Sequence, residues 1–286
     1  MSEIRLEGLR HVYSRGTPFE KVAIDHIDLT FPAGQLVVIL GHTGSGKSTL
    51  VQHLNGLLAP TEGRVLLNGE DIHRSKQALR QTRFEVGLVF QYPEYQLFEE
   101  TVRADIAYGP KNMGLSGEEL EEHIRAGADF AGVPEELFDD SPLDLSGGQK
   151  RRVAIAGVMA MEPGVLILDE PTAGLDPAGC QDILDNISRY KEATGSTVIL
   201  ISHDMSVAAR MADRIIVINH GNVALDGTAR EVFSHAAELK EMGLDIPAST
   251  EVALMLREKG FDLPEDICTS EQLVEAVLRC KGGAAC

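Results

Sequence analysis

Residues 41–49, GHTGSGKST, carry the functional groups that binding of a nucleoside triphosphate requires. The glycines let backbone N–H groups curl around phosphate oxygens, and Lys47 supplies a cation for the β- and γ-phosphates. Ser48 supplies a hydroxyl for Mg²⁺. A buried strand is expected before the segment and a helix after it, which separates a P-loop from a plain glycine-rich turn. The predicted ATP-binding residues of this loop are Gly41, His42, Thr43, Gly44, Ser45, Gly46, Lys47, Ser48 and Thr49.

Two adjacent carboxylates, Asp169 and Glu170, follow the apolar run VLIL at the end of a predicted strand. On its own such a pair is the plain start of a loop. In a chain that also has a P-loop, Asp169 is predicted to hold Mg²⁺ through water. Glu170 is placed to accept a proton from an attacking water. The sequence therefore predicts nucleotide hydrolysis rather than nucleotide binding alone.

A second anion-binding site is predicted at residues 144–157, DLSGGQKRRVAIAG. Ser146 is the expected N-cap of a helix, and two glycines expose the first N–H groups of that helix. Arg151 and Arg152 follow and are expected to add positive charge. Because the P-loop already binds one triphosphate, the two helix starts suggest that they share a nucleotide.

The elements that must position these groups alternate between strands and helices. Residues 3–41 read mainly as strands, a helix is predicted at 47–58, and a further strand at 84–90. Strands and helices alternate again over residues 165–219, which implies a parallel sheet with βαβ crossovers. Residues 93–145 are helical in pattern and hold 14 acidic against 3 basic residues. This acidic block is therefore an insertion into an α/β domain.

The predicted fold class is α/β, with a P-loop NTPase core, an inserted helical subdomain and a C-terminal helical extension. The sheet of the core is expected to be mostly parallel, accompanied by N-terminal antiparallel strands. The expected boundaries are 1–92 and 159–232 for a RecA-like ATP-binding core, 93–158 for the helical subdomain and 233–286 for the extension.

Composition and charge exclude several classes of protein. The chain has 286 residues and a formal net charge of −18, so it is not expected to coat nucleic acid, which requires clustered Lys and Arg. The N-terminal residues show no signal-peptide pattern, and no apolar run approaches the roughly 20 residues of a membrane helix. The four cysteines match no zinc or redox spacing. We expect a cytosolic location, with any membrane role mediated by a partner.

Five motifs, in this order, resemble those of the ATP-binding subunit of an ABC transporter over residues 3 to about 230. They are the P-loop, the signature LSGGQ, the strand VLILDE, the triplet GLD at 174–176 and the triplet SHD at 202–204. In this family two subunits pair head to tail, and each ATP lies between the P-loop of one and the signature of the other. The resemblance implies that Lys47 of one chain faces four signature residues of its partner, Ser146, Gly147, Gly148 and Gln149.

Other residues take roles only from this resemblance. His203 would be the switch histidine that contacts the γ-phosphate, although a histidine can also simply cap a strand end. Tyr13 would stack on adenine, although an aromatic residue on a strand can also be core, and Asp176 would lie near the dimer seam. Gln91 resembles the Q-loop glutamine, whose amide reaches Mg²⁺ and the attacking water. The implied catalytic set is Lys47, Gln91, Glu170 and His203, the implied Mg²⁺ set is Ser48, Gln91 and Asp169, and the remaining histidines, including His42 and His53, have no predicted side-chain role.

Residues 92–98, YPEYQLF, follow Gln91 at the junction of the core and the acidic block. In the family, the membrane subunit docks a coupling helix at this junction. Apolar and aromatic residues would line the docking groove, and the acidic block would favour a basic coupling helix. The alternative is a turn packed on the helical block, with a solvated acidic face.

Several longer segments resemble one branch of the ABC transporter superfamily in particular. FQYPEYQLFEETV, YGPKN and DEPTAGLDP resemble the ATPases of energy-coupling factor (ECF) transporters, and GTPFE favours the second of their two ATPase types. Such transporters import vitamins or transition-metal ions through two ATPases, a shared transmembrane scaffold and an exchangeable substrate-binding membrane subunit. The resemblance implies a peripheral protein on the cytoplasmic face of the cell membrane. Residues 243–278 resemble C-terminal helices that add to the ATPase dimer contact.

Three alternatives to this interpretation have sequence features that distinguish them. The ATPase of a conventional importer, fed by an extracytoplasmic binding protein, would lack the wording around residues 97–100 and the tail. A soluble ABC ATPase acting on ribosomes or DNA usually has two cassettes or a long coiled coil. A nucleotide sensor without turnover would not need Glu170 and His203. The cargo, and whether the second ATPase is an identical or a related chain, stay open.

Overall fold

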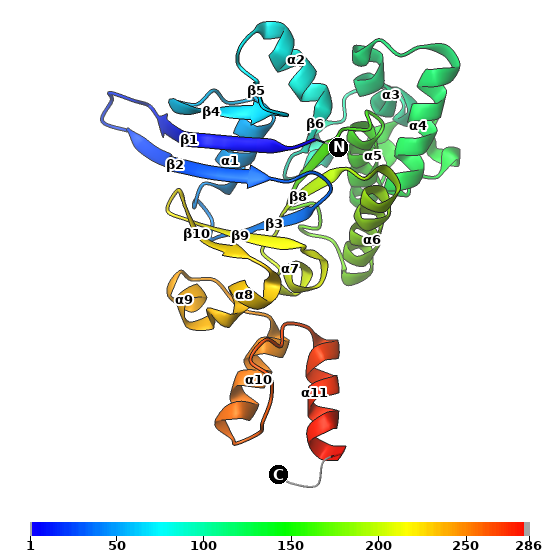
Figure 1. The fold of residues 1–286 in the computed structure, drawn as a ribbon. Helices are drawn as coiled ribbons and strands as arrows, with labels where there is room; N and C mark the ends of the chain where they lie inside the picture. Colours follow the sequence, from blue (N-terminus) through cyan, green and yellow to red (C-terminus); the bar gives the residue numbers. More distant parts are fainter. Residues whose placement is uncertain (1, 283–286) are drawn as a thin grey trace.

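The computed structural model describes residues 2–282 of the chain and contains two sheets. The smaller sheet is antiparallel and has the strand order β2-β1-β4-β5 (Figure 1). Its strands are β1 (Ile4–Tyr13), β2 (Lys21–Phe31), β4 (Glu62–Leu67) and β5 (Glu70–Asp71). The predicted N-terminal antiparallel strands are therefore confirmed.

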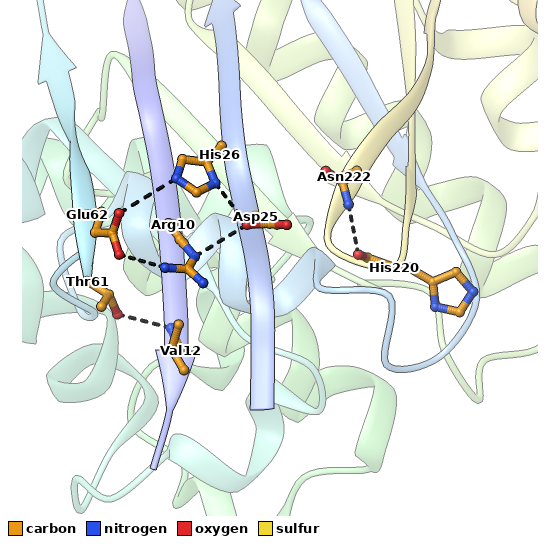
Figure 2. A network of polar contacts seen from close by, with 8 residues as sticks. All are labelled: Arg10, Val12, Asp25, His26, Thr61, Glu62, His220 and Asn222. Carbon is orange, nitrogen blue, oxygen red and sulfur yellow. Dashed lines mark hydrogen bonds and ion pairs between the residues drawn. The ribbon is translucent and has the colours of Figure 1, made fainter. Parts of the chain in front are cut away.

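Charged side chains link three strands of the smaller sheet. Figure 2 shows Arg10 of β1 between Asp25 of β2 and Glu62 of β4. Its Nε lies 3.3 Å from Asp25 Oδ1 and its Nη1 lies 2.6 Å from Glu62 Oε1. His26 also contacts both carboxylates. Near the end of β1, the Val12 N–H donates to Thr61 Oγ1 at 3.0 Å. This bond links β1 to the residue that directly precedes β4.

The larger sheet has the strand order β10-β9-β3-β8-β7-β6. All neighbouring pairs are parallel except β9 and β10. Parallel strands end at one edge of a sheet, where α/β proteins bind ligands. The segments that follow β3, β8, β7 and β6 therefore lie side by side and bring the predicted catalytic residues to one edge. The strands are β3 (Leu36–Leu40), β6 (Val86–Val89), β7 (Val165–Asp169), β8 (Thr197–Ile201), β9 (Arg214–Asn219) and β10 (Asn222–Gly227).

Strand β3 lies between two hydrophobic cores. Leu36, Val38 and Leu40 join the core formed with the helices, whereas Val37 and Ile39 join the core formed with helix α1 and the smaller sheet. A strand covered on both faces is expected to be an uninterrupted apolar run, and LVVIL is one. This burial fixes the position of the P-loop, which starts directly after β3.

The inserted helical block lies beside β6 (Figure 1). It begins with a short 3₁₀ turn at Pro93–Gln96 and contains α3 (Val102–Met113), α4 (Gly117–Ala131) and α5 (Gly147–Met159), with further 3₁₀ turns at Glu135–Leu137 and Pro142–Asp144. Helix α5 packs against both α3 and α4 and also contacts β6. The helix that carries the signature is thus built into this block. The helices around the sheets are α1 (Lys47–Leu54), α2 (Lys76–Glu85), α6 (Pro177–Thr194) and α7 (Met205–Met211).

The C-terminal part is helical: its first helix packs on β9 and β10, and its last two helices extend away from the sheets (Figure 1). It consists of α8 (Ala229–Ser234), α9 (Ala236–Glu241), α10 (Ala248–Glu258) and α11 (Ser270–Gly282). Helices α10 and α11 enclose a small separate core around Ala253, Leu263, Ile267 and Ala276. The expected extension to residue 286 includes four residues that lie outside the described ones.

Two sequence predictions about elements need correction, and one strand was missed. Helix α1 ends at Leu54 rather than at residue 58, because the Asn55 amide bonds the Val86 carbonyl and Gly56 turns with a φ of +71°. Strand β6 begins at Val86, since residues 84–85 complete α2. Strand β10 was not predicted; as an exposed edge strand, it has neither an apolar run nor clean alternation. None of the helices within residues 2–282 has the length and apolarity needed to cross a bilayer.

Candidate nucleotide-binding site

The P-loop has a shape that only glycine permits at two positions. Gly41 has a φ of +153°, and a Cβ there would lie 2.3 Å from the carbonyl oxygen of Ile218. Gly46 has a φ of +115°, and a Cβ there would lie 2.6 Å from the carbonyl oxygen of Ala23. Both glycines let the loop pass close to backbone of neighbouring strands. The loop is therefore fixed by packing within this chain.

Lys47, the first residue of α1, is buried against the loop that precedes it. Its Nζ donates to the carbonyl oxygens of Gly41 and His42, at 2.7 and 3.0 Å. Burial lowers the pKa of the Lys47 ammonium, while the charges of Glu170 and Asp169 oppose that shift. The ammonium is thus held by the loop that would surround the phosphates.

Glu170 lies against two predicted catalytic residues. Gln91 Nε2 donates to Glu170 Oε2 at 3.0 Å, because a carboxylate oxygen accepts and the amide nitrogen is the donor. His203 Nε2 makes a polar contact of 2.6 Å with Glu170 Oε1. The three residues come from the ends of β6, β7 and β8, adjacent strands of one sheet. The sheet edge therefore assembles the set that the sequence predicted.

Two left-handed backbone positions lie at the same place. Glu170 has a φ of 51° and Tyr92, directly after Gln91, has a φ of 55°. Left-handed conformations cost non-glycine residues roughly 1–3 kcal/mol and persist where the surroundings impose them. The Glu170 N–H donates to the carbonyl of Ile201 at 3.1 Å, which holds the turn in place.

The side chains of Asp169, Ser48 and Gln91 are oxygen donors of the kind that Mg²⁺ prefers. Burial raises the pKa of the Asp169 carboxyl, and a hydrogen bond from the Ser48 hydroxyl and the charge of Lys47 counteract this. A nearby cation would favour the ionised carboxylate further. Since the Gln91 nitrogen faces Glu170, its amide oxygen remains as an acceptor. The donor set fits a hard divalent cation.

Tyr13 stands at the end of β1, close to the phosphate-binding helix. Its ring is 39% exposed, so it is not a core residue. Its hydroxyl lies 3.2 Å from Thr49 Oγ1 on α1. An exposed aromatic face next to a P-loop helix could accept a base.

The signature segment begins α5 with a capping box. Ser146 N–H donates to Gln149 Oε1 at 2.9 Å, and the Gln149 N–H donates to Ser146 Oγ at 3.4 Å. A Cβ on Gly147 would meet no atom within 4 Å, and one on Gly148 only Leu175 at 3.9 Å. Packing in this chain therefore does not require either glycine. Such bare backbone suits the close approach of a group from outside.

The structure does not bring the signature segment to the P-loop of the same chain. Among residues 2–282 no hydrogen bond or ion pair joins residues 146–149 to residues 41–49. The signature instead borders a cleft of about 490 Å³ that is also lined by Gly174 and Asp176. Asp176 caps α6 by accepting from the Gly179 N–H at 2.7 Å. The predicted ATP-binding residues thus form two groups on one chain.

The expected contribution of Arg151 to anion binding was wrong. Arg151 is buried and forms a bidentate ion pair with Glu94, with Nε–Oε2 at 3.0 Å and Nη2–Oε1 at 2.7 Å. Its third nitrogen donates to the carbonyls of Pro171 and Ala173. Arg152 pairs with Asp182 at 2.9 Å on the surface and lines the same cleft as the signature, so its contribution stays a prediction.

Sequence reasoning missed the link that Arg151 makes between three segments. It joins the signature helix to Glu94 of the 3₁₀ turn after Gln91, and to the backbone just after Glu170. A signal existed, because Arg151, Ile155 and Met159 follow helical spacing and all three are buried. An arginine on the buried face of a helix requires an acidic partner.

Exposed aromatic side chains gather after Gln91. Tyr92, Tyr95 and Phe98 are 45%, 84% and 64% exposed, and Tyr108 of α3 lies edge-on to Phe98 at 4.9 Å between ring centroids. The turn at Pro93–Gln96 packs on α5, as the alternative predicted, although these three rings stay exposed. Exposed aromatic clusters mark contact surfaces for other proteins.

Comparisons with known proteins agree with this geometry. A family model described as ABC transporter matches residues 24–173. The energy-coupling factor transporter ATP-binding protein EcfA2 of Clostridium perfringens is 52% identical over 276 residues, covering 96% of this chain and 97% of that protein. The structure of cbiO1 from Clostridium perfringens, described as part of the ABC transporter complex cbiONQ, superposes with a TM-score of 0.73 at 38% identity, covering 84% of this chain and 94% of that one. The ATP-binding cassette MJ0796, a dimer bound to ADP and Pi, gives 0.72 at 29% identity, covering 79% and 99%.

Proposed function

The chain belongs to the ABC transporter family as an ATPase subunit of the energy-coupling factor type, and on that premise we propose how its residues bind and hydrolyse ATP. The observation that carries the proposal is the placement of Glu170 between Gln91 and His203, beside Lys47 and Asp169 at one sheet edge. A carboxylate that accepts a hydrogen bond from Gln91 and contacts His203, next to a triphosphate loop, is arranged for general-base catalysis.

In the proposed reaction, residues 41–49 bind the phosphates of ATP and Lys47 neutralises charge on the β- and γ-phosphates. Glu170 accepts a proton from water as that water attacks the γ-phosphorus. The bond from the γ-phosphorus to the bridging oxygen breaks, so ADP and phosphate leave. His203 contacts the γ-phosphate and orients Glu170. Tyr13 stacks on adenine and fixes the far end of the nucleotide.

We include Mg²⁺ as the companion ion of ATP, bound through Ser48 and Gln91 and, through water, Asp169. When bound, it neutralises charge on the phosphate oxygens. Two of the residues that would hold it already form hydrogen bonds in the structure. Gln91 donates to Glu170, and the Ser48 hydroxyl donates to Asp169. Loading of the site would therefore rearrange the hydrogen bonds around Glu170.

We further propose that ATP lies between two chains, with the P-loop of one opposite Ser146, Gly147, Gly148 and Gln149 of the other. Support comes from the bare glycines at the start of α5 and from the separation of the two groups within one chain. The relative MJ0796 is dimeric in its solved structure. Asp176, which lines the same cleft as the signature, would lie at the dimer seam. Because the signature reaches ATP only in the closed dimer, ATP binds that state more tightly and drives closure.

The C-terminal helices offer a second contact between the two ATPase subunits. Val252 and Met255 of α10 and Val274 and Leu278 of α11 are each more than 40% exposed. Apolar residues at these spacings form stripes along both helices, which favours burial against another helix. We propose that residues 233–286 form a dimerisation extension, alongside a core at 1–92 and 159–232 and a helical subdomain at 93–158.

At the membrane, we propose that the aromatic segment 92–98 docks a transmembrane scaffold subunit, which also carries an exchangeable substrate-binding subunit. The segment is exposed, and it is joined to the Glu170 region through Gln91 and through Glu94–Arg151. The protein would then sit on the cytoplasmic face of the cell membrane as a peripheral subunit. The cargo would be a vitamin or a transition-metal ion, the substrates of this transporter type.

The test of this proposal is Glu170→Gln, which keeps the side-chain shape but removes the base. Turnover should fall by roughly two to four orders of magnitude. The variant should accumulate as an ATP-bound dimer, measured by size-exclusion chromatography with light scattering in ATP and Mg²⁺. An unchanged turnover, or a variant that stays monomeric with ATP and with its partner ATPase, would contradict the role of Glu170.

Whether the second ATPase is an identical chain can be decided in the same assay. Turnover by the chain alone, with ATP-dependent self-association, would indicate a homodimer with two identical sites. Turnover only after mixing with a related ATPase would indicate a heterodimer, which the likeness to the second ATPase type favours.

A further inference from the structure

A pair of buried histidines lies between the end of β1 and the phosphate-binding helix α1. His53 is fully buried and His11 is 9% exposed. His53 Nε2 lies 3.1 Å from His11 Nδ1, and the two rings meet edge to face at 4.7 Å between centroids. Neither residue touches the catalytic cluster around Glu170.

The hydrogen-bond partners fix the protonation of the pair. His53 Nδ1 lies 2.7 Å from the carbonyl oxygen of Thr49, which can only accept, so Nδ1 carries the proton. Burial lowers the pKa of His53 to about 4, so the ring is neutral and Nε2 is an acceptor. His11 Nδ1 must then be the donor. The result is a directed chain of hydrogen bonds from His11 through His53 to α1.

The chain of contacts continues to Tyr13 and closes on itself. The His11 ring meets the Tyr13 ring edge to face, 4.5 Å between centroids. The Tyr13 hydroxyl returns to Thr49, the residue whose carbonyl holds His53. Tyr13 and His11 are two residues apart on a strand, while Thr49 and His53 are four apart on a helix, so each pair shares a face.

The pairing of β2 with β1 is irregular beside this ring of contacts. His11 pairs with Ile24 and Val12 with Val22, so the extra residue between these two pairs belongs to β2. The same holds on the other side of His11, towards Leu9. The bulges therefore lie on β2, while His11 and Tyr13 stand two residues apart on β1 with their rings in contact.

We propose that His11 and His53 are positioning residues that hold Tyr13 in a fixed place relative to α1, so that the adenine and phosphate sites bind ATP as one unit. The inference rests on the proposed role of Tyr13 as the adenine platform. The ring of Tyr13 is 39% exposed, and its hydroxyl makes a polar contact of 3.2 Å with Thr49. A ring held on one side by His11 keeps its other surface available to the base. Pre-ordering the ring removes an ordering cost from ATP binding.

The test compares ATP with inorganic tripolyphosphate, which has the phosphates but no base. Both displace a fluorescent ATP analogue from the full chain in the presence of Mg²⁺. We expect His11→Leu to weaken ATP by about three- to tenfold, a fraction of the value of base–aromatic stacking. Tripolyphosphate should change by less than about twofold. His11→Asn, whose amide nitrogen can stand where Nδ1 donates, should restore most of the ATP affinity.

A double-mutant cycle with Tyr13→Ala separates this inference from the proposed function. Tyr13→Ala should weaken ATP, and His11→Leu should have no further effect in that background. If Tyr13→Ala leaves ATP affinity unchanged, the adenine role of Tyr13 fails, and the positioning role fails with it. If Tyr13→Ala weakens ATP but His11→Leu does not, only the positioning role is overturned.

Two controls exclude a general loss of structure. His235→Leu replaces a histidine whose side chain is 53% exposed and pairs with Glu238, and it should change neither affinity. In the assembled ATPase, His11→Leu should raise the KM for ATP with little change in kcat, since Glu170 and Gln91 are untouched. Equal weakening of ATP and tripolyphosphate, a fall in kcat alone, or no rescue by His11→Asn would each overturn the proposal.

Discussion

The sequence predicts phosphate binding at two helix starts, α1 and α5. They differ in how far contacts within the chain account for the residues found there. At α1, close contacts inside the chain require Gly41 and Gly46, and the Lys47 ammonium bonds its own loop. At α5, Gly147 has open space around it, and only the capping box within residues 146–149 is satisfied. A phosphate site can thus be complete within one chain, or shaped for completion by another. Glycines that look alike in the sequence are therefore present for different reasons: packing within the chain requires Gly41 and Gly46 but does not require Gly147.

The contrast between the two helix starts requires that α5 is firmly held. Arg151 holds it by its bonds to Glu94 and to the Ala173 carbonyl. Arg151→Met leaves the Glu94 carboxylate buried without its partner. We expect a loss of about 3–5 kcal/mol in the free energy of unfolding, because an uncompensated buried charge is strongly unfavourable. Urea unfolding followed by circular dichroism measures it.

The double variant Arg151→Met with Glu94→Leu serves as the control for that loss. Removing both charges should recover a large part of the stability, since no unpaired charge remains. Additive losses from the two single changes would show that the ion pair itself contributes nothing.

Gly147→Val tests whether the bare start of α5 serves the partner chain rather than its own fold. A side chain at this position meets no atom of its own chain, so the free energy of unfolding and the ATP affinity of the isolated chain should stay unchanged. Turnover of the assembled ATPase pair should fall by about 100-fold, because the added side chain holds the partner's ATP away from the helix start. Coupled phosphate release measures turnover, and equilibrium ATP binding measures affinity.

The matched variant on the other helix start is Gly41→Ala. Here the added Cβ collides with the Ile218 carbonyl, so ATP binding should already weaken in the isolated chain. If Gly147→Val also weakened ATP binding by the isolated chain, the distinction between the two starts would be lost.

A smaller effect is expected from pH at the α1 side. The folded-state pKa of His53, about 4, lies below the unfolded value near 6.5, so below pH 6.5 the unfolded state binds a proton that the folded state does not. Stability from this residue is present above pH 6.5 and is lost as the pH falls towards 4. Between pH 7 and pH 5 the loss should be about 2 kcal/mol. Comparing urea unfolding of the wild type with His53→Phe isolates this residue, because only the wild type should show this component.

The hydrolytic cluster could be predicted from the sequence because it follows strand ends. Gln91, Glu170 and His203 come directly after apolar runs, and parallel strands bring such positions to one edge without any detailed knowledge of packing. The same reasoning gave the parallel sheet and the inserted helical block. It did not give β10, whose position at a sheet edge leaves no hydrophobic pattern.

Contacts that depend on side-chain direction could not be predicted in this way. Arg151 looked like an anion-binding residue because it follows Ser146 closely, yet its face of α5 is buried and points it at Glu94. His11 and His53 lie 42 residues apart, and the packing of β1 against α1 brings them together. Sequence spacing within one element carries face information, but the meeting of two elements depends on the packed core.

The smallest predicted effect concerns the cap of α5 and tests whether Ser146 serves the fold or the partner. Within the chain, its hydroxyl oxygen accepts from the Gln149 N–H, so Ser146→Ala should cost about 1 kcal/mol of unfolding free energy, whereas Ser146→Gly should cost only a few tenths. If capping were the whole role, turnover of the assembled pair would follow stability, and the glycine variant would be nearly normal. If the hydroxyl also meets the partner's ATP, both variants should lose turnover to a similar degree despite their different stabilities. Measuring stability and turnover on both variants separates the two roles of Ser146. Loss of the cap should harm the alanine variant more than the glycine variant, because glycine is the better N-cap residue, whereas loss of a contact with ATP should harm both equally.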